Sequence, residues 1–231
     1  MPAFPAPMRQ NWGKLLFMHW PVPVEMLRPH LPARLDVDTF EGQAWLALVP
    51  FTMSDIRILG LPASPALREL NVRTYVCLNG VPGVWFFSLD ADSPLLVWGA
   101  RALAHLPYLH ADFTFQQQAD TLTYTARRTH QGYAAAEFAV TWAVGAPLPP
   151  SAPGSLVRFL TERYLLYAAW GERLYRGRVW HAPWALRAAT LAPDWHSTVI
   201  ESHGLTLPPA TPPLLHYAEH VAVQLWPLRR V

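Results

Sequence analysis

The stretch from Glu69 to His110 constrains the fold of this chain more than any other part. It predicts a strand, a two-residue turn at Asn79-Gly80, a second strand, and then a helix over about 94–105 that follows Ser93. Asn-Gly favours a hairpin because both central residues of a type I′ turn need positive φ. Serine followed by proline is a typical helix start, since serine caps the first N–H groups and proline has none to leave unpaired. We expect an antiparallel hairpin that leads directly into a helix.

The first of these strands, at 69–78, has two unlike faces because side chains alternate along a strand. One face is almost entirely aliphatic, and the other carries Glu69, Asn71, Arg73, Tyr75 and Cys77. Polar residues in this pattern form either a solvated surface or the wall of a polar cavity. Glu69 and Arg73 are also placed to form an ion pair with each other. The sequence leaves these alternatives open.

Many short strands with close turns account for most of the remaining chain. Only one other segment, 155–171, predicts a long helix, which Ser155 would cap and Gly171 would end. This pattern is typical of an α+β protein with a mostly antiparallel sheet, curled or closed, and two main helices. No repeat or charge run divides the chain, and 145–154 is the only candidate linker, so we expect a single domain over 1–231.

Composition excludes several classes of function. A net charge of +2 without a basic run argues against nucleic-acid binding. The single cysteine, Cys77, excludes an intrachain disulfide and a cysteine-based metal cluster. The first residues lack the pattern of a signal peptide, and no apolar run reaches the ~18–20 residues that a membrane helix requires. We expect a soluble cytoplasmic protein with neither a nucleic-acid nor a membrane partner.

His216 and His220, with Glu219 between them, would suggest a metal site if this segment were helical. The segment reads as a strand, in which residues four apart are separated by about 13 Å. One metal ion cannot bridge that distance. We therefore expect no metal. We also expect no other cofactor, because the chain has no Gly-rich phosphate loop.

Five phrases stand out along the chain: HWPVPVEMLRPHLP at 19–32, DTFEGQAWLALVPF at 38–51, ELNVRTYV at 69–76, GVWFFSLDADS at 83–93 and HYAEHVAVQLWPL at 216–228. Together they resemble the YqjF-like family of uncharacterised conserved proteins, over nearly the whole chain. That family in turn resembles the acetoacetate decarboxylases in fold. The resemblance implies a largely antiparallel sheet, curled into a cone or barrel around an interior cavity, more firmly than it implies an activity.

The decarboxylases form a Schiff base through a lysine that follows a Phe-Pro pair after a short helix. In this chain the matching place holds Pro107, Tyr108 and Leu109, and the only lysine is Lys14, far upstream. Arginine cannot replace the lysine, because it stays protonated and forms no imine. The resemblance therefore implies the fold without Schiff-base decarboxylation, and we expect Lys14 to be an ordinary surface residue.

Candidate site residues come from the polar strand face and from the end of the first helix. The resemblance implies a glutamate on the corresponding strand, which Glu69 or Asn71 matches. Arg73 could hold a carboxylate in a two-pronged hydrogen bond. Asn71, Arg73, Tyr75, His19 and Tyr108 are the candidate ligand-binding residues, although the pattern favours His19 as a core histidine bonded to a carbonyl. Glu69, Tyr108 and His110 are the candidates for moving protons, since a free histidine titrates near ~6.5.

Three functions fit these residues. The first is the binding of a small organic acid or carbonyl compound in an interior cavity, with or without chemistry. The second is association with a partner or with itself, in a protein whose interior is simply packed. Low surface charge and many aromatic residues are compatible with this function. The third is an acid–base lyase or hydratase without a Schiff base. The sequence does not decide whether the protein is an enzyme.

Overall fold

A computed structural model describes residues 6–58, 63–209 and 211–231. All its strands belong to one sheet. They are β1 (Met8–Val22), β2 (Asp36–Val37), β3 (Ala44–Ile58), β4 (Leu67–Leu78), β5 (Val81–Ala91), β6 (Tyr108–Gln118), β7 (Thr121–Arg128), β8 (Glu137–Pro147), β9 (Leu165–Trp170), β10 (Arg173–His181), β11 (Leu186–Leu191), β12 (His196–Ser197), β13 (Leu214–Leu225) and β14 (Arg229–Arg230). The helices are α1 (Val24–Leu27), α2 (Pro94–Ala104) and α3 (Leu156–Thr161), with 3-10 turns η1 (Arg28–His30) and η2 (Glu201–His203).

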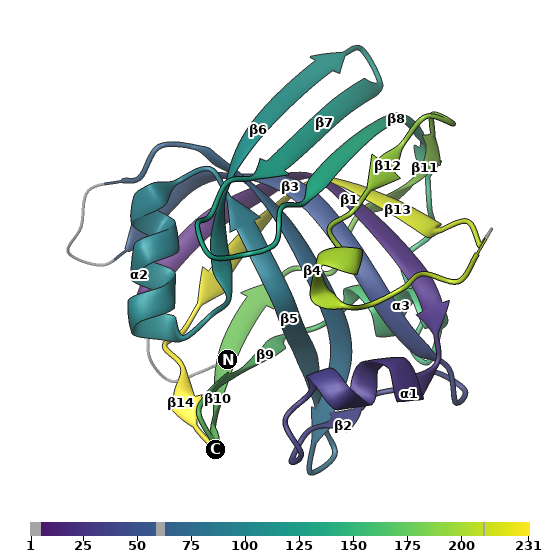
Figure 1. Cartoon of the computed structure of the whole chain (residues 1–231). Coiled ribbons are helices and arrows are strands. Elements are labelled where there is room, and N and C mark those ends of the chain that lie inside the picture. Colours follow the sequence, from purple (N-terminus) through teal and green to yellow (C-terminus); the bar gives the residue numbers. More distant parts are fainter. Residues whose placement is uncertain (1–5, 59–62, 210) are drawn as a thin grey trace.

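The sheet closes on itself twice, through the pairs β4–β5 and β10–β13. One closure makes a large ring of nine strands, in the order β4, β5, β6, β7, β8, β11, β13, β1 and β3. The other makes a small ring of seven strands, in the order β4, β5, β9, β10, β13, β1 and β3. The five strands common to both rings form a shared wall, with β6, β7 and β8 on one side of it and β9 and β10 on the other (Figure 1).

Each face of the shared wall belongs to a different ring, because side chains alternate along every strand. Facing the large ring, the wall contributes Leu46, Leu48, Leu70 and Val72, which pack with Tyr124 of β7 and Trp142 of β8. Facing the small ring, it contributes Phe17, Val49 and Phe51, which pack with Leu166 of β9 and Val179 of β10. The wall therefore separates two cores.

The hairpin and the first helix form as predicted. Asn79 and Gly80 have φ values of 51° and 77°, and β4 and β5 pair antiparallel on either side of them. The Ser93 hydroxyl accepts a hydrogen bond from the Leu96 amide at the start of α2. The pairs β5–β6 and β5–β9 are parallel, and the other pairs are antiparallel. The α+β class with a mostly antiparallel, curled sheet is confirmed.

The predicted extent of the second helix is wrong. Ser155 caps α3 as expected, but the helix ends at Thr161 and β9 follows. Strand β9 is flanked by both β5 and β10, so it has partners on each edge. A short apolar run such as 165–170 cannot be assigned to helix or strand from periodicity. Its two neighbouring strands decide the outcome here.

No helix within the described ranges combines the length and the apolar composition needed to cross a bilayer.

Candidate functional site

The small ring encloses a cavity of about 90 Å³. One water needs about 10–15 Å³ on this measure, so the space suits a molecule of roughly six to nine non-hydrogen atoms. Most lining side chains are apolar or aromatic. The charged and polar ones include Gln10, Glu69, Asn71, Arg73, Tyr108 and Arg163. The cavity thus combines an apolar wall with a few polar groups, which is the usual composition of a small-molecule site.

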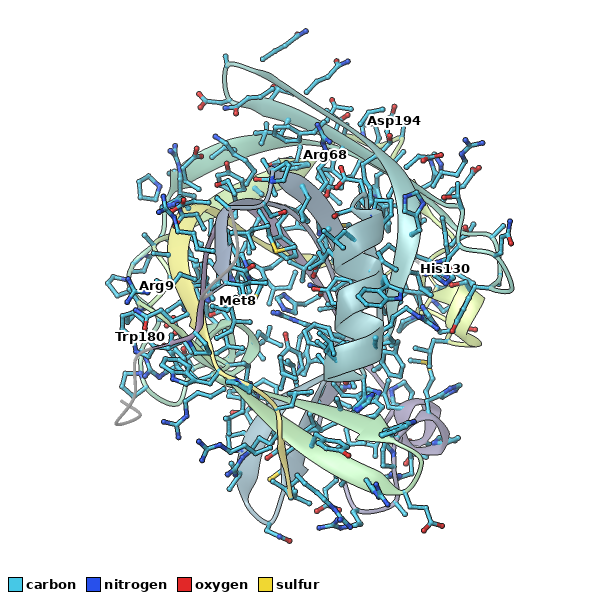
Figure 2. The ribbon with its side chains drawn as sticks, turned by 90° about the vertical axis from the view of Figure 1, so that its left-hand side faces the viewer. Met8, Arg9, Arg68, His130, Trp180 and Asp194 are labelled. Carbon is cyan, nitrogen blue, oxygen red and sulfur yellow. The ribbon has the colours of Figure 1, made fainter. Side chains whose placement is uncertain are left out.

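The polar face of β4 is a cavity wall, which answers the question that the sequence left open. Glu69, Asn71 and Arg73 all line the cavity. Glu69 is 2% exposed and Asn71 is 4% exposed. Arg68, beside Glu69, and Met8, at the start of β1, lie on the side of the molecule that carries α2 (Figure 2). The Glu69 end of this polar face therefore lies nearer to α2 than the Arg73 end does.

Glu69 and Tyr108 come together at this end of the cavity. The Tyr108 hydroxyl donates a 2.7 Å hydrogen bond to Glu69 Oε2, and Asn71 Nδ2 donates a long one, 3.5 Å, to Glu69 Oε1. Burial raises the pKa of Glu69 to about 7, although the hydrogen bonds from Tyr108 and Asn71 oppose the rise. Glu69 can therefore gain or lose a proton near neutral pH, as a general acid or base must.

Two arginines lie at the other end of the polar face. The Arg73 guanidinium carbon is 5.5 Å from the centre of the Phe17 ring, and its Nε and Nη2 atoms are buried without a hydrogen-bond partner in the described chain. Arg163 donates from Nη1 to Asp38 Oδ2 over 2.6 Å, while its Nη2 is also unpartnered among the described residues. The described residues form no Glu69–Arg73 ion pair. Unpartnered guanidinium N–H groups in a cavity suit an anion.

His19 and Tyr75 lie behind the cavity lining. Tyr75 donates its hydroxyl proton to the Leu160 carbonyl oxygen over 2.7 Å, and its oxygen is 2.8 Å from His19 Nε2. Because the only Tyr75 hydroxyl proton is used, His19 Nε2 must be the donor. Burial, then the nearby Arg73 charge, lower the pKa of His19 well below its usual range. Tyr75 also packs against Arg73, whose guanidinium carbon is 5.9 Å from the Tyr75 ring centre.

His110 does not join the site. The His110 Nδ1 atom is 2.9 Å from the hydroxyl oxygen of Thr129, the residue that directly follows β7. Among the described residues that line the cavity, His110 does not appear. Lys14 forms an ion pair with Glu219 and likewise contributes nothing to the described cavity wall. The structure therefore brings together Glu69, Asn71, Arg73 and Tyr108 but places His110 elsewhere.

The histidines of β13 do not form a metal site. His216 is buried beside His19, with ring centres 6.2 Å apart, whereas His220 is exposed. Across the described residues, no three His, Cys, Asp or Glu side chains group closely enough to hold a metal ion.

Sequence reasoning missed Arg163, Trp12 and Trp184. Arg163 was assigned to the interior of a helix, which hid its place just after α3. Trp12 and Trp184 stack with ring centres 6.4 Å apart, and Trp184 Nε1 donates to the Thr161 carbonyl oxygen. Arg163 could have been recognised as a second cavity arginine only if the end of α3 at Thr161 had been known. No motif marks either tryptophan.

A family described as "Uncharacterized conserved protein" matches residues 9–222. The chain belongs to this family. Its relative in Bacillus subtilis (strain 168), the uncharacterized protein YqjF, is 44% identical over 231 residues, which cover 96% of this chain and 92% of the relative. The predicted resemblance to the YqjF-like family is confirmed.

Solved structures with the same fold have low sequence identity to this family member. Acetoacetate decarboxylase from Legionella pneumophila has a TM-score of 0.66 and 12% identity, covering 100% of this chain and 90% of its own. The enduracididine biosynthesis enzyme MppR, solved in complex with pyruvate, has a TM-score of 0.63 and 13% identity, covering 99% of this chain and 91% of its own. At such identities the likeness shows the fold alone, and it confirms the acetoacetate-decarboxylase-like fold.

Proposed function

We propose that the protein binds a small organic carboxylate in the cavity of the small ring. Arg73 and Arg163 would hold the carboxylate, while Asn71 and Tyr108 would contact the remainder of the molecule. The observation that carries this proposal is the set of buried guanidinium atoms, Arg73 Nε and Nη2 and Arg163 Nη2, without hydrogen-bond partners in the described chain.

The physical reason is the cost of burying a charge without a partner. A buried cation is tolerated when it is paired and hydrogen-bonded, and unpaired donors in a dry site destabilise the fold. A carboxylate has two oxygens that accept two parallel N–H bonds from a guanidinium, which is the strongest geometry for such a pair. A ligand carboxylate would complete the hydrogen bonding of both arginines.

The fold neighbours support the size and class of the ligand. MppR binds pyruvate, a small carboxylate with a carbonyl group, within a fold that this chain shares. The present chain has Pro107 and Tyr108, and no lysine, at the place of the Schiff-base lysine. Any reaction in this cavity would rest on acid–base chemistry by Glu69 and Tyr108, as in a lyase or hydratase, and not on an imine.

The test is a thermal-shift and calorimetry screen against pyruvate, acetoacetate and butyrate. A ligand at a hundred times its dissociation constant should add ~2.7 kcal/mol of stability, a rise in Tm of roughly 5–10 °C. Arg73→Gln should abolish the shift. Arg127→Gln should not, because Arg127 is an exposed residue that pairs with Asp112. Equal binding by both variants, or no binding by the wild-type protein, would rule out the proposal.

Self-association is the second candidate function, and the exposed face of α2 favours it. Leu95, Trp98 and Leu103 are 77%, 66% and 80% exposed. Apolar side chains grouped on a surface mark sites of association. Size-exclusion chromatography with light scattering tests this candidate: a dimer that Trp98→Glu converts to a monomer would support it, and a wild-type monomer at all concentrations would exclude it.

A further inference from the structure

The cavity has a second set of unpartnered polar atoms, besides those of the arginines. They are Gln10 Oε1, Trp12 Nε1 and Asn71 Oδ1, all buried and without a hydrogen-bond partner in the described chain. Each belongs to a residue that lines the cavity. These atoms are uncharged, so they require a different ligand group from the carboxylate that suits Arg73 and Arg163.

The strand register places Trp12 near Glu69 and far from Arg73. Trp12 of β1 lies opposite Met53 of β3, and the Trp12 ring is 5.5 Å from the ring of Phe51, which lies opposite Glu69. Arg73 lies opposite Ala47, four residues further along β3 from Phe51. Four residues on a strand span about 13 Å between Cα atoms. Side chains point into the cavity along this length, so the free distance between the atoms near Glu69 and those near Arg73 is shorter than about 13 Å.

The chemistry of these atoms is mixed. Gln10 Oε1 and Asn71 Oδ1 are hydrogen-bond acceptors. The Asn71 amide is oriented by its Nδ2, which donates to Glu69, so Oδ1 is the atom that lacks a partner among the described residues. Trp12 Nε1 is only a donor. The Tyr108 hydroxyl proton is already used on Glu69. These three atoms therefore need a ligand group that both donates and accepts.

A hydroxyl group does both, because it can accept from Trp12 Nε1 and donate its one proton to one of the two amide oxygens. A ketone oxygen could accept from Trp12 but would leave the acceptors of Asn71 and Gln10 unmet. An ammonium group could donate to those acceptors but would leave the Trp12 N–H unmet, because it has no lone pair to accept with. A methyl group would meet none of them.

From this polarity we infer that the ligand is a short hydroxy carboxylate, with its carboxylate on Arg73 and Arg163 and its hydroxyl between Trp12 and Asn71. This rests on the proposed function and adds to it the identity of the second polar group. A chain of about four carbons matches the cavity of about 90 Å³. The preferred ligand is then a hydroxy acid rather than the keto acid of the same carbon skeleton.

The experiment measures the dissociation constants of 3-hydroxybutyrate, acetoacetate, 3-aminobutyrate and butyrate by calorimetry, with each enantiomer of the hydroxy and amino acids. An unmet buried hydrogen-bonding group weakens binding by roughly tenfold or more. One enantiomer of 3-hydroxybutyrate should therefore bind about tenfold more tightly than butyrate or acetoacetate. Asn71→Leu should reduce that preference to near unity.

Trp12→Phe provides a second variant, because it removes the indole N–H and keeps an aromatic ring. It should also lower the preference for the hydroxy acid, and it does so even if Asn71→Leu fails to fold. Equal affinities for all the acids, with binding still lost in Arg73→Gln, would overturn the hydroxy-acid inference and keep the proposed function. No binding of any acid by the wild-type protein would overturn both.

Discussion

The two rings share a wall of five strands, yet they treat an inward-facing arginine in opposite ways. In the large ring, Arg128 donates to both oxygens of Asp90 and also to the hydroxyls of Ser88 and Ser202. In the small ring, Arg73 leaves Nε and Nη2 unpartnered among the described side chains. A fully hydrogen-bonded buried charge holds a fold together, whereas an unsatisfied one is available to a ligand.

The difference extends to the side chains around each arginine. Trp142, Tyr124 and Phe138 fill the large ring without exposure above 1%. The small ring keeps a cavity of about 90 Å³ within a lining that is also largely apolar. The same wall thus supports a packed core on one face and a polar cavity on the other. The large ring is thus packed around a satisfied ion pair, whereas the small ring holds the cavity to which the proposed ligand is assigned.

Breaking the Asp90–Arg128 pair should have the largest effect on stability. Arg128→Met would leave the Asp90 carboxylate buried, 1% exposed, without its partner. The free energy of unfolding, measured by urea titration at pH 8, should fall by about 3–5 kcal/mol. The double variant Asp90→Leu with Arg128→Met should recover most of the loss, because no charge then stays buried. A single variant as stable as the wild type would contradict a structural role for this pair.

Glu69 should make stability depend on pH. Its pKa is raised from 4.5 to about 7 in the folded protein, first by burial. The folded state therefore keeps the proton to a higher pH than the unfolded state, so its contribution is fully present below pH 4.5 and is lost as pH rises to about 7. Glu69→Gln removes this dependence. The variant should gain about 3 kcal/mol of unfolding free energy relative to the wild type between pH 4.5 and 8.

Urea titrations of the two proteins across this pH range would measure the effect. Asp90, whose burial raises its pKa to about 6, titrates in both proteins, so most of its contribution is common to the two curves. A constant difference at all pH values would show that Glu69 is ionised in the folded state throughout.

Removing the Arg73 guanidinium should stabilise the unliganded protein. Arg73→Met keeps the length of the side chain and its contact with Phe17 while removing unpartnered donors, so the free energy of unfolding should rise by about 1–3 kcal/mol. The opposite sign from Arg128→Met is the direct test of the comparison between the rings. A loss of stability in Arg73→Met would show that this arginine, too, is structural.

The smallest effect should come from a matched pair of valines in the shared wall. Val72 faces the large ring and Val49 lines the cavity. Val72→Ala opens a new cavity in a packed core, while Val49→Ala enlarges an existing one, so the first should cost about 1 kcal/mol more than the second. Thermal and urea unfolding of the two variants measures this difference. Equal losses would show that both faces are packed to the same density.

The local features were predictable because their causes lie within a few residues. Asn79-Gly80 makes a turn through its own φ preferences, and Ser93 caps α2 through its own hydroxyl. The end of α3 was not predictable in this way, because Leu165–Trp170 is apolar on both faces and became a strand only beside β5 and β10. His110 was expected in the site on the strength of its position after α2, but it lies outside the cavity and its Nδ1 is 2.9 Å from the hydroxyl oxygen of Thr129, which directly follows β7.

The sequence by itself determined which side chains share a face of β4, where the hairpin turns, and that the Schiff-base lysine is missing from its expected place. These follow from chain alternation, turn chemistry and residue identity. Only the tertiary structure decided that the polar face points into a cavity and that Arg163 joins Arg73 there. Both outcomes depend on pairs of strands far apart in the chain, β5–β9 and β10–β13, whose hydrogen bonds close the small ring. Ring closure is a non-local event, and no local pattern encodes which face it will enclose.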